Sequence, residues 1–334
     1  MSYIELNKSS FFNNLDIIAQ KTSDTAKIAL VLKDNAYGHG LLEIAQMAKE
    51  YGISKAVVRR EAEAEQIKGQ FEYILILSPV FPVSNTADYN YTINSIEDIE
   101  KFPAKSRVEL KVDTGMHRNG IPMDELEDAF KKIEAKKLIL EAVFTHHRSS
   151  DTMSAEWFWQ KKNFEAVKKR SLAYKKELRF HSSNSAALFR SSGCDEHMVR
   201  VGIAAYGCLQ MDKGFNATGL KPVLCLYADK ISSRRLAKGE RVGYNATFEA
   251  EGDMDVSNYD IGYADGLMRS LSNNYRTPEG YALLGRVSMD NSTYKCSEQK
   301  LLVFDDANTV ADFAGTIGYE VLTSLSASIA RRII

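Results

Sequence analysis

Short runs of aliphatic and β-branched residues recur along the first two thirds of the chain, with longer segments of helical periodicity between them. Segments such as 41–52 and 123–137 space their apolar residues three and four positions apart and place Glu and Lys on the other face. A strand followed by a helix, repeated, predicts a parallel sheet with right-handed crossovers. The eight predicted strands are 27–33, 55–58, 73–78, 91–94, 108–113, 140–146, 179–183 and 198–203.

Eight such units within about 200 residues favour a closed (β/α)8 TIM-like barrel, because an open sheet would leave an apolar edge strand exposed. Beyond residue 220 the chain changes to short strand-like pieces separated by Gly, Asn and Asp, which predicts a mostly β second domain. The fold class is therefore α/β, with an N-terminal barrel and a C-terminal mostly β domain. We expect residues 1–10 to form a strand that pairs into the second domain, 11–220 the barrel, and 221–334 the β domain.

The composition is that of a soluble globular protein of 334 residues, 44% hydrophobic and 26% charged, long enough for a barrel of roughly 250 residues and a smaller domain. Lys and Arg number 43 against 44 Asp and Glu, so the net charge of −1 gives no field for nucleic acid or anionic membrane. The opening residues lack the features of a signal peptide, and no stretch approaches the ~18 apolar residues of a membrane helix. We expect a cytoplasmic protein that acts on a small molecule.

The four cysteines are scattered without CxxC spacing, which favours reduced thiols over a zinc site or a redox pair. They are Cys194, Cys208, Cys225 and Cys296.

Lys33 ends the first predicted strand, in the segment LVLKDNAYGHG, at the end of the barrel where such enzymes place functional groups. A lysine there can simply extend its amine to solvent. The two glycines that follow, with Tyr37 and His39, instead make a tight polar loop able to approach a phosphate. From this position alone both interpretations stay open.

The segment VLKDNAYGHG resembles the N-terminal signature of alanine racemases, the fold-type III family of enzymes that use pyridoxal 5'-phosphate (PLP). In that family the lysine carries PLP as a Schiff base, so the resemblance implies that Lys33 anchors the cofactor and that Tyr37 helps to bind it. Further segments resemble the same family in order, at the ends of later predicted strands.

The segment VELKVDTGMHRNG is similar to the family stretch that holds the substrate carboxylate, which implies that Arg118 binds substrate. A guanidinium suits this task because it binds a carboxylate through two hydrogen bonds and stays charged. Lys111 matches a lysine that is carbamylated in many members. His146, in FTHHRSSD, resembles the histidine that hydrogen-bonds the arginine facing the pyridine nitrogen.

The segments HSSNSAA and MVRVGIAAYG resemble the family's remaining cofactor contacts. Ser185 and the amides of Gly202 and Ile203 would bind phosphate, and Arg200 would face the pyridine nitrogen. An always-charged arginine leaves that nitrogen unprotonated and weakens the electron sink, which favours proton exchange at Cα. This distinguishes a racemase from the related decarboxylases, which have an acidic residue in that role.

In the second domain, RVGYNATF resembles the segment that bears the family's second catalytic base, here Tyr244. IGYADG and GRVSMDNS carry Tyr263, Met289 and Asp290, which match residues of the substrate pocket and its entrance. Racemisation needs one base on each face of Cα, and the resemblance implies Lys33 and Tyr244. It also implies a homodimer in which each subunit completes the other's site, and the supply of D-alanine for peptidoglycan.

The chain departs from the family pattern at Asp34, His117, the pair His147 and Arg148, and Ala327. Ala327 stands where the family typically has a phosphate-binding tyrosine, and we hypothesise that the space so emptied broadens tolerance for serine. The alternatives are a broad-specificity amino-acid racemase, a PLP-dependent decarboxylase and a non-catalytic PLP-binding protein. Arg200 disfavours the decarboxylase. The predicted β domain, which supplies Tyr244, disfavours the non-catalytic PLP-binding protein.

Overall fold

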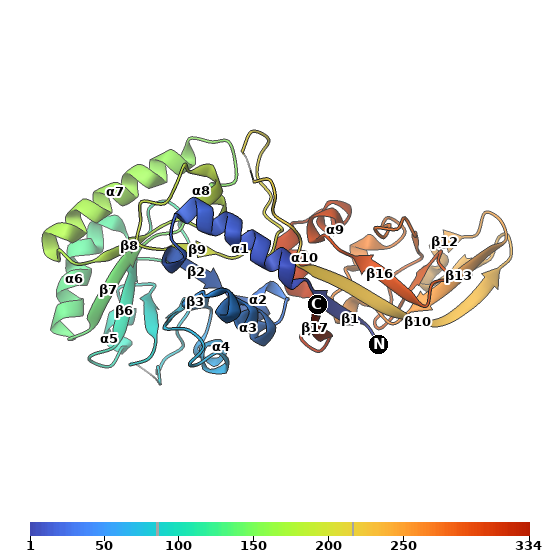
Figure 1. Ribbon diagram of the computed structural model, residues 1–334, viewed down its shortest axis with the longest axis horizontal. Coiled ribbons are helices and arrows are strands. Elements are labelled where there is room, and N and C mark those ends of the chain that lie inside the picture. The colour runs from blue at the N-terminus through green and yellow to red at the C-terminus, as the bar shows by residue number, and fades with distance from the viewer. Residues whose placement is uncertain (85–86, 216) are drawn as a thin grey trace.

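The computed structural model describes residues 1–84, 87–215 and 217–334, and it consists of a barrel and an elongated β part that lie end to end (Figure 1). The eight barrel strands form one parallel sheet in the order β8-β7-β6-β5-β4-β3-β2-β9. Arg200 of β9 closes the ring, since its amide donates to Ser183 O at 2.9 Å in a parallel bridge beside β8. The predicted TIM-like barrel is confirmed. Its strands are β2 (Ile28–Val31), β3 (Lys55–Val58), β4 (Tyr73–Ile76), β5 (Asn90–Ile93), β6 (Arg107–Lys111), β7 (Ile139–Phe144), β8 (Arg179–His181) and β9 (Val199–Val201).

The longer helices cover the outside of the barrel because each has an apolar stripe that packs against the strands. The helix Leu41–Tyr51, for example, buries Leu41, Ile44 and Met47 and ends at Gly52, whose φ of 98° suits glycine. The helices of this part are α1 (Lys8–Thr22), α2 (Lys33–Tyr37), α3 (Leu41–Tyr51), α4 (Glu61–Gln66), α5 (Asp98–Lys101), α6 (Leu126–Ala135), α7 (Glu156–Tyr174) and α8 (Ser185–Arg190).

The C-terminal part is built on one long strand, β10 (Leu224–Leu236), which pairs with β13, β16 and β1. Strand β1 (Tyr3–Leu6) runs antiparallel to β10 and parallel to β17, so the two ends of the chain meet beside the barrel (Figure 1). The other elements are β11 (Arg241–Val242), β12 (Phe248–Glu249), β13 (Met254–Tyr259), β14 (Leu283–Leu284), β15 (Ser292–Tyr294), β16 (Lys300–Phe304), α9 (Ala307–Ala314), α10 (Gly318–Ser324) and β17 (Ala330–Ile333).

Helix α10 connects the two parts, because it packs against α2 at the carboxyl end of the barrel strands. A Cβ added to Gly38 would lie 1.9 Å from Leu322 O, so the backbones of α2 and α10 touch at a position that only glycine permits. The ring of Tyr319 lies 5.8 Å from that of Tyr37. Among the described residues, none of the helices is both long and apolar enough to cross a membrane.

Candidate active site

Lys33 is followed by one turn of left-handed helix, an unusual conformation for residues with side chains. Residues 34–37 all have φ between 51° and 56°, and Gly38 continues the turn at 76°. Each such residue costs roughly 1–2 kcal/mol, so the turn must be held by its surroundings. The amide of Asp34 donates to Glu63 Oε1 at 2.7 Å, and Asn35 Oδ1 accepts from Leu41 N at 2.9 Å.

This strained turn fixes the direction of two predicted site residues. Lys33 Nζ lies 5.9 Å from the centre of the Tyr37 ring, so the amine and the phenol share one side of the turn. The Lys33 amine also lies 3.8 Å from Asp34 Oδ2, a residue that departs from the family pattern. Strain of this kind is concentrated at functional sites, where the fold holds a side chain in a set position.

Tyr37, Ser185 and Gly202 form a cradle of hydrogen-bonding groups at the ends of β8 and β9. Ser185 Oγ accepts from Gly202 N at 3.1 Å and from Ala204 N at 3.3 Å. A Cβ on Gly202 would lie 2.7 Å from the Tyr37 hydroxyl, so only glycine leaves room. Burial raises the pKa of Tyr37, which keeps its hydroxyl a donor. The neighbouring amide of Ile203 completes a set of uncharged donors at a helix start, which fits a phosphate group.

Arg200 lies beside this cradle and is 6% exposed. Its Nη1 donates to His181 Nδ1, and its Nη2 donates to Thr145 O at 2.8 Å and Ser182 O at 3.2 Å. All hydrogen bonds that its side chain makes to the described residues come from Nη1 and Nη2, which leaves the Nε–H for a ligand. Burial lowers the pKa of Arg200 to about 10, which still leaves the guanidinium charged at neutral pH. This is a donor that fits an unprotonated pyridine nitrogen.

The imidazole that accepts from Arg200 is that of His181, and the sequence interpretation had given this role to His146. His146 nevertheless lies close to Arg200, Lys111 and Arg118. Burial, together with these three cations, lowers the pKa of His146 well below its ordinary value, so its ring is neutral. Sequence reasoning missed His181, although a histidine in the middle of a predicted buried strand was a usable signal.

Lys111 stands at the end of β6 within a group of positive charges. Burial, Arg118 and Arg200 together lower the pKa of Lys111 to about 8, and Lys33 adds to the effect. Arg118 is exposed in the loop after β6, which Asp113 shapes by accepting from Gly115 N at 2.9 Å. The structure therefore brings together the predicted residues Lys33, Lys111, Arg118, His146 and Arg200.

Three of the four predicted residues of the C-terminal part lie in adjacent loops. Tyr263 and Met289 are neighbours, since Ala264 N donates to Met289 O at 2.9 Å, and Asp290 follows in an exposed loop. Tyr263 is 44% exposed, Met289 54% and Tyr244 65%, which is high for large side chains. Tyr244 begins the turn that joins β11 to β12, and β12 lies at the end of the molecule away from the barrel (Figure 1). Within one chain, Tyr244 is therefore far from Lys33.

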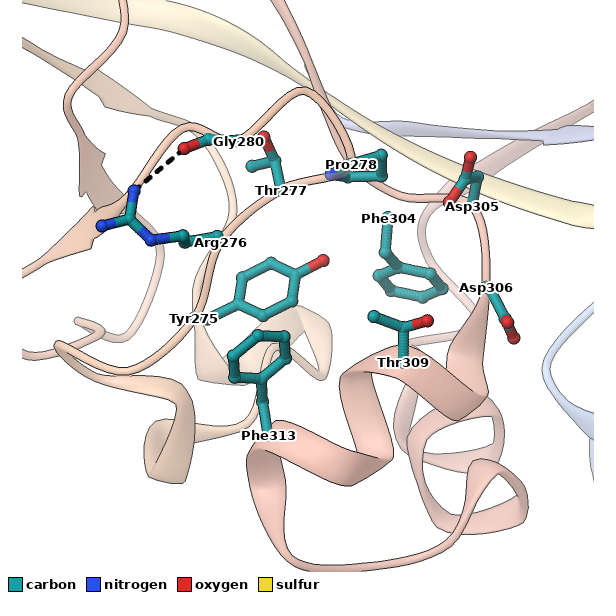
Figure 2. A pocket seen from close by; sticks show the side chains of 10 residues that line it. All are labelled: Tyr275, Arg276, Thr277, Pro278, Gly280, Phe304, Asp305, Asp306, Thr309 and Phe313. Atoms are coloured by element: carbon teal, nitrogen blue, oxygen red, sulfur yellow. Dashed lines mark hydrogen bonds between the residues drawn. The ribbon is translucent and has the colours of Figure 1, made fainter.

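A cavity of about 390 Å³ lies elsewhere in the C-terminal part, between the loop 275–280 and α9 (Figure 2). The rings of Tyr275, Phe304 and Phe313 line it, and Asp305 stands at its edge. Arg276 binds the Gly280 carbonyl at 3.1 Å within the same loop. None of the candidate residues for cofactor or substrate lines this cavity.

Comparison with known proteins identifies the family of the chain. The family models "Alanine racemase, N-terminal domain" and "Alanine racemase, C-terminal domain" match residues 6–210 and 223–333. The chain is 44% identical to the alanine racemase of Campylobacter concisus over 100% of both chains, and 42% identical to that of Nitratiruptor sp. over 99% of both.

Solved structures show the same likeness over the whole chain. An alanine racemase of Clostridium difficile has a TM-score of 0.91 at 26% identity, covering 100% of this chain and 95% of the other. The alanine racemase of E. faecalis has a TM-score of 0.88 at 29% identity, covering 100% and 98%. On the strength of both domain matches and these full-length relatives, the chain belongs to the alanine racemase family of isomerases.

Proposed function

We propose that the protein interconverts L-alanine and D-alanine with PLP bound at Lys33, by a two-base mechanism, as a homodimer with shared sites. The observation that carries the proposal is the convergence of Lys33, the phosphate cradle and the free Nε–H of Arg200 at one end of the barrel. When bound there, PLP supplies an electron-withdrawing ring that stabilises the negative charge left at Cα. We further propose that the D-alanine is made in the cytoplasm for peptidoglycan.

Different residues at the barrel end bind different parts of the cofactor and the substrate. Lys33 would hold PLP through its amine, while the Tyr37 and Ser185 hydroxyls and the Gly202 and Ile203 amides would hold the phosphate. Arg200 would donate to the pyridine nitrogen without protonating it. Arg118 holds the substrate carboxylate, since it is the exposed guanidinium of the positive cluster.

Inversion at Cα requires a proton to leave from one face and to return on the other. The Lys33 Nζ takes or gives the proton on one face of Cα, and the Tyr244 hydroxyl takes or gives it on the opposite face. Because Tyr244 is exposed and far from Lys33 in the same chain, it fits the site of a second subunit. Tyr263, Met289 and Asp290 accompany Tyr244 and border the entrance of that site.

The function is tested by incubating purified protein with L-alanine and PLP and following both enantiomers by chiral chromatography. We expect equal amounts of L-alanine and D-alanine at equilibrium, because the enantiomers have the same free energy. Release of carbon dioxide and ethylamine would instead indicate a decarboxylase. Unchanged L-alanine with bound PLP would indicate a non-catalytic PLP-binding protein.

Lys111 is expected to be carbamylated. The ammonium group first loses one proton. The neutral amine then attacks carbon dioxide, forms the N–C bond and releases a second proton, so the side chain changes overall from a cation to an anion beside Arg118. Since the pKa of Lys111 is lowered to about 8, the neutral form and hence the carbamate increase as the pH rises through that value. Carbon-13 NMR with labelled bicarbonate should show a carbamate signal that Lys111→Ala removes. No such signal above pH 8 would contradict the prediction.

Ala327 lines a cavity of about 330 Å³ together with Asn35 and Gly40, next to the left-handed turn. A larger side chain in this cavity should leave less space for the side chain of the substrate. We therefore expect Ala327→Tyr to lower kcat/KM for L-serine relative to L-alanine by about tenfold. Ala330→Tyr is the matched control, because Ala330 lines the same cavity outside the predicted phosphate position. An unchanged ratio of the two substrates in Ala327→Tyr would contradict the hypothesis.

A further inference from the structure

Glu109 is a fully buried carboxylate in the middle of β6, two residues before Lys111 and therefore on the same face of the strand. Its Oε1 accepts from the Tyr73 hydroxyl at 2.6 Å and from Arg179 Nη2 at 3.0 Å. Its Oε2 lies 2.8 Å from His181 Nε2. Burial alone would raise the pKa of Glu109, but the hydrogen bonds from His181 and Tyr73 and the charge of Arg179 outweigh it and hold the pKa below its ordinary value, so the group is ionised.

The charge on Glu109 determines which nitrogen of His181 carries the hydrogen. An ionised carboxylate can only accept, so His181 Nε2 must be the donor. Burial lowers the pKa of His181, although Glu109 opposes the effect, and the ring is neutral. A neutral ring with hydrogen on Nε2 has a lone pair on Nδ1, and that atom accepts from Arg200 Nη1. One buried carboxylate thus sets the direction of two successive hydrogen bonds.

We propose that Glu109 is a positioning residue of the racemase: it keeps His181 as an acceptor for Arg200 Nη1 and so directs the Arg200 Nε–H to the pyridine nitrogen. In metal sites, the outer partners of the ligands change affinity or activity by about 10–100-fold because they fix the orientation of the ligand, and we expect an effect of the same size here. The proposal rests on the proposed function of Arg200, but its first step concerns only protein atoms and is measurable by itself.

Glu109→Gln tests this step because the geometry dictates how the amide must lie. Arg179 can only donate, so the amide oxygen has to occupy the Oε1 position. The amide NH2 then faces His181 Nε2, which has to become the acceptor. The hydrogen of His181 would then lie on Nδ1 and point at the N–H of Arg200, so the hydrogen bond between the two residues would be lost. Glu141→Gln is the matched control, since Glu141 accepts from the same Arg179 at 3.4 Å and does not bond His181.

The first measurement is the nitrogen-15 NMR spectrum of the full-length holoenzyme labelled at histidine, with His181 assigned by His181→Asn. We expect the Nε2–H form in the wild type and in Glu141→Gln, and the Nδ1–H form in Glu109→Gln. An Nδ1–H or doubly protonated His181 in the wild type overturns the proposal, and this result does not depend on whether Glu109→Gln folds. An unchanged tautomer in Glu109→Gln also overturns it. Neither result depends on whether the protein racemises alanine.

The second measurement follows a side reaction of the holoenzyme, transamination, whose rate depends on the protonation of the pyridine nitrogen. In transamination the amino acid is oxidised to its 2-oxo acid, with water supplying the oxygen, while PLP is reduced to pyridoxamine phosphate. A displaced Arg200 no longer suppresses this route, so we expect pyridoxamine phosphate per racemisation event to rise about tenfold in Glu109→Gln. We expect no change in Glu141→Gln. A switched tautomer without this rise overturns the link from Glu109 to the cofactor.

Discussion

Lys33→Ala should lower the rate of alanine racemisation by about 10⁴-fold or more, because it removes both the covalent anchor of the cofactor and one of the two bases. The variant should also lose the visible absorbance that PLP acquires when it is bound to a lysine amine. The rate is measured by chiral chromatography of L-alanine, and the absorbance by a spectrum of the dialysed protein.

The control for this prediction is Lys49→Ala, which removes an exposed lysine of α3 on the outside of the barrel. It should keep the wild-type rate and spectrum. Retention of a tenth of the activity by Lys33→Ala would contradict the assignment of Lys33.

Tyr244→Phe should lower kcat by about 10²–10⁴-fold, the usual contribution of a positioned acid–base group. The variant keeps Lys33, so one enantiomer should still lose its Cα hydrogen to solvent deuterium, although the proton returns to the face it left. Proton NMR in deuterium oxide follows the exchange, and chiral chromatography follows inversion. Exchange without inversion, from one enantiomer only, is the expected signature of a missing second base.

Tyr227→Phe serves as the control, because Tyr227 is a packing residue of β10 whose ring stacks on Tyr3 at 5.1 Å. It should racemise alanine at the wild-type rate. If Tyr244→Phe lost exchange from both enantiomers equally, or kept the wild-type kcat, Tyr244 would not be the second base.

The barrel could be predicted from the sequence because its eight strands are short apolar runs at regular spacing, and all eight are present. The left-handed turn after Lys33 could not, since Asp34, Asn35 and Ala36 carry no local signal for several successive positive φ angles. That conformation is imposed by contacts with Glu63 and Leu322, which are distant in sequence.

The partners of Arg200 illustrate a second limit. Periodicity places Glu109 and His181 inside the barrel, but it does not say that their side chains meet across strands that are 72 positions apart in sequence. A charged residue within a predicted strand of a barrel, where strands are buried on both faces, was the available signal. The roles of Arg118, Tyr244, Tyr263 and Met289 came from the resemblance to a family and not from pattern.

The central claim is that Lys33 of one subunit and Tyr244 of another complete one active site. It is tested most directly by coexpressing Lys33→Ala and Tyr244→Phe with different affinity tags and purifying the mixed dimer. That dimer has one site with both bases and one site with neither, so it should show about half of the wild-type activity, although each parent is nearly inactive. A mixed dimer as inactive as its parents would contradict the account.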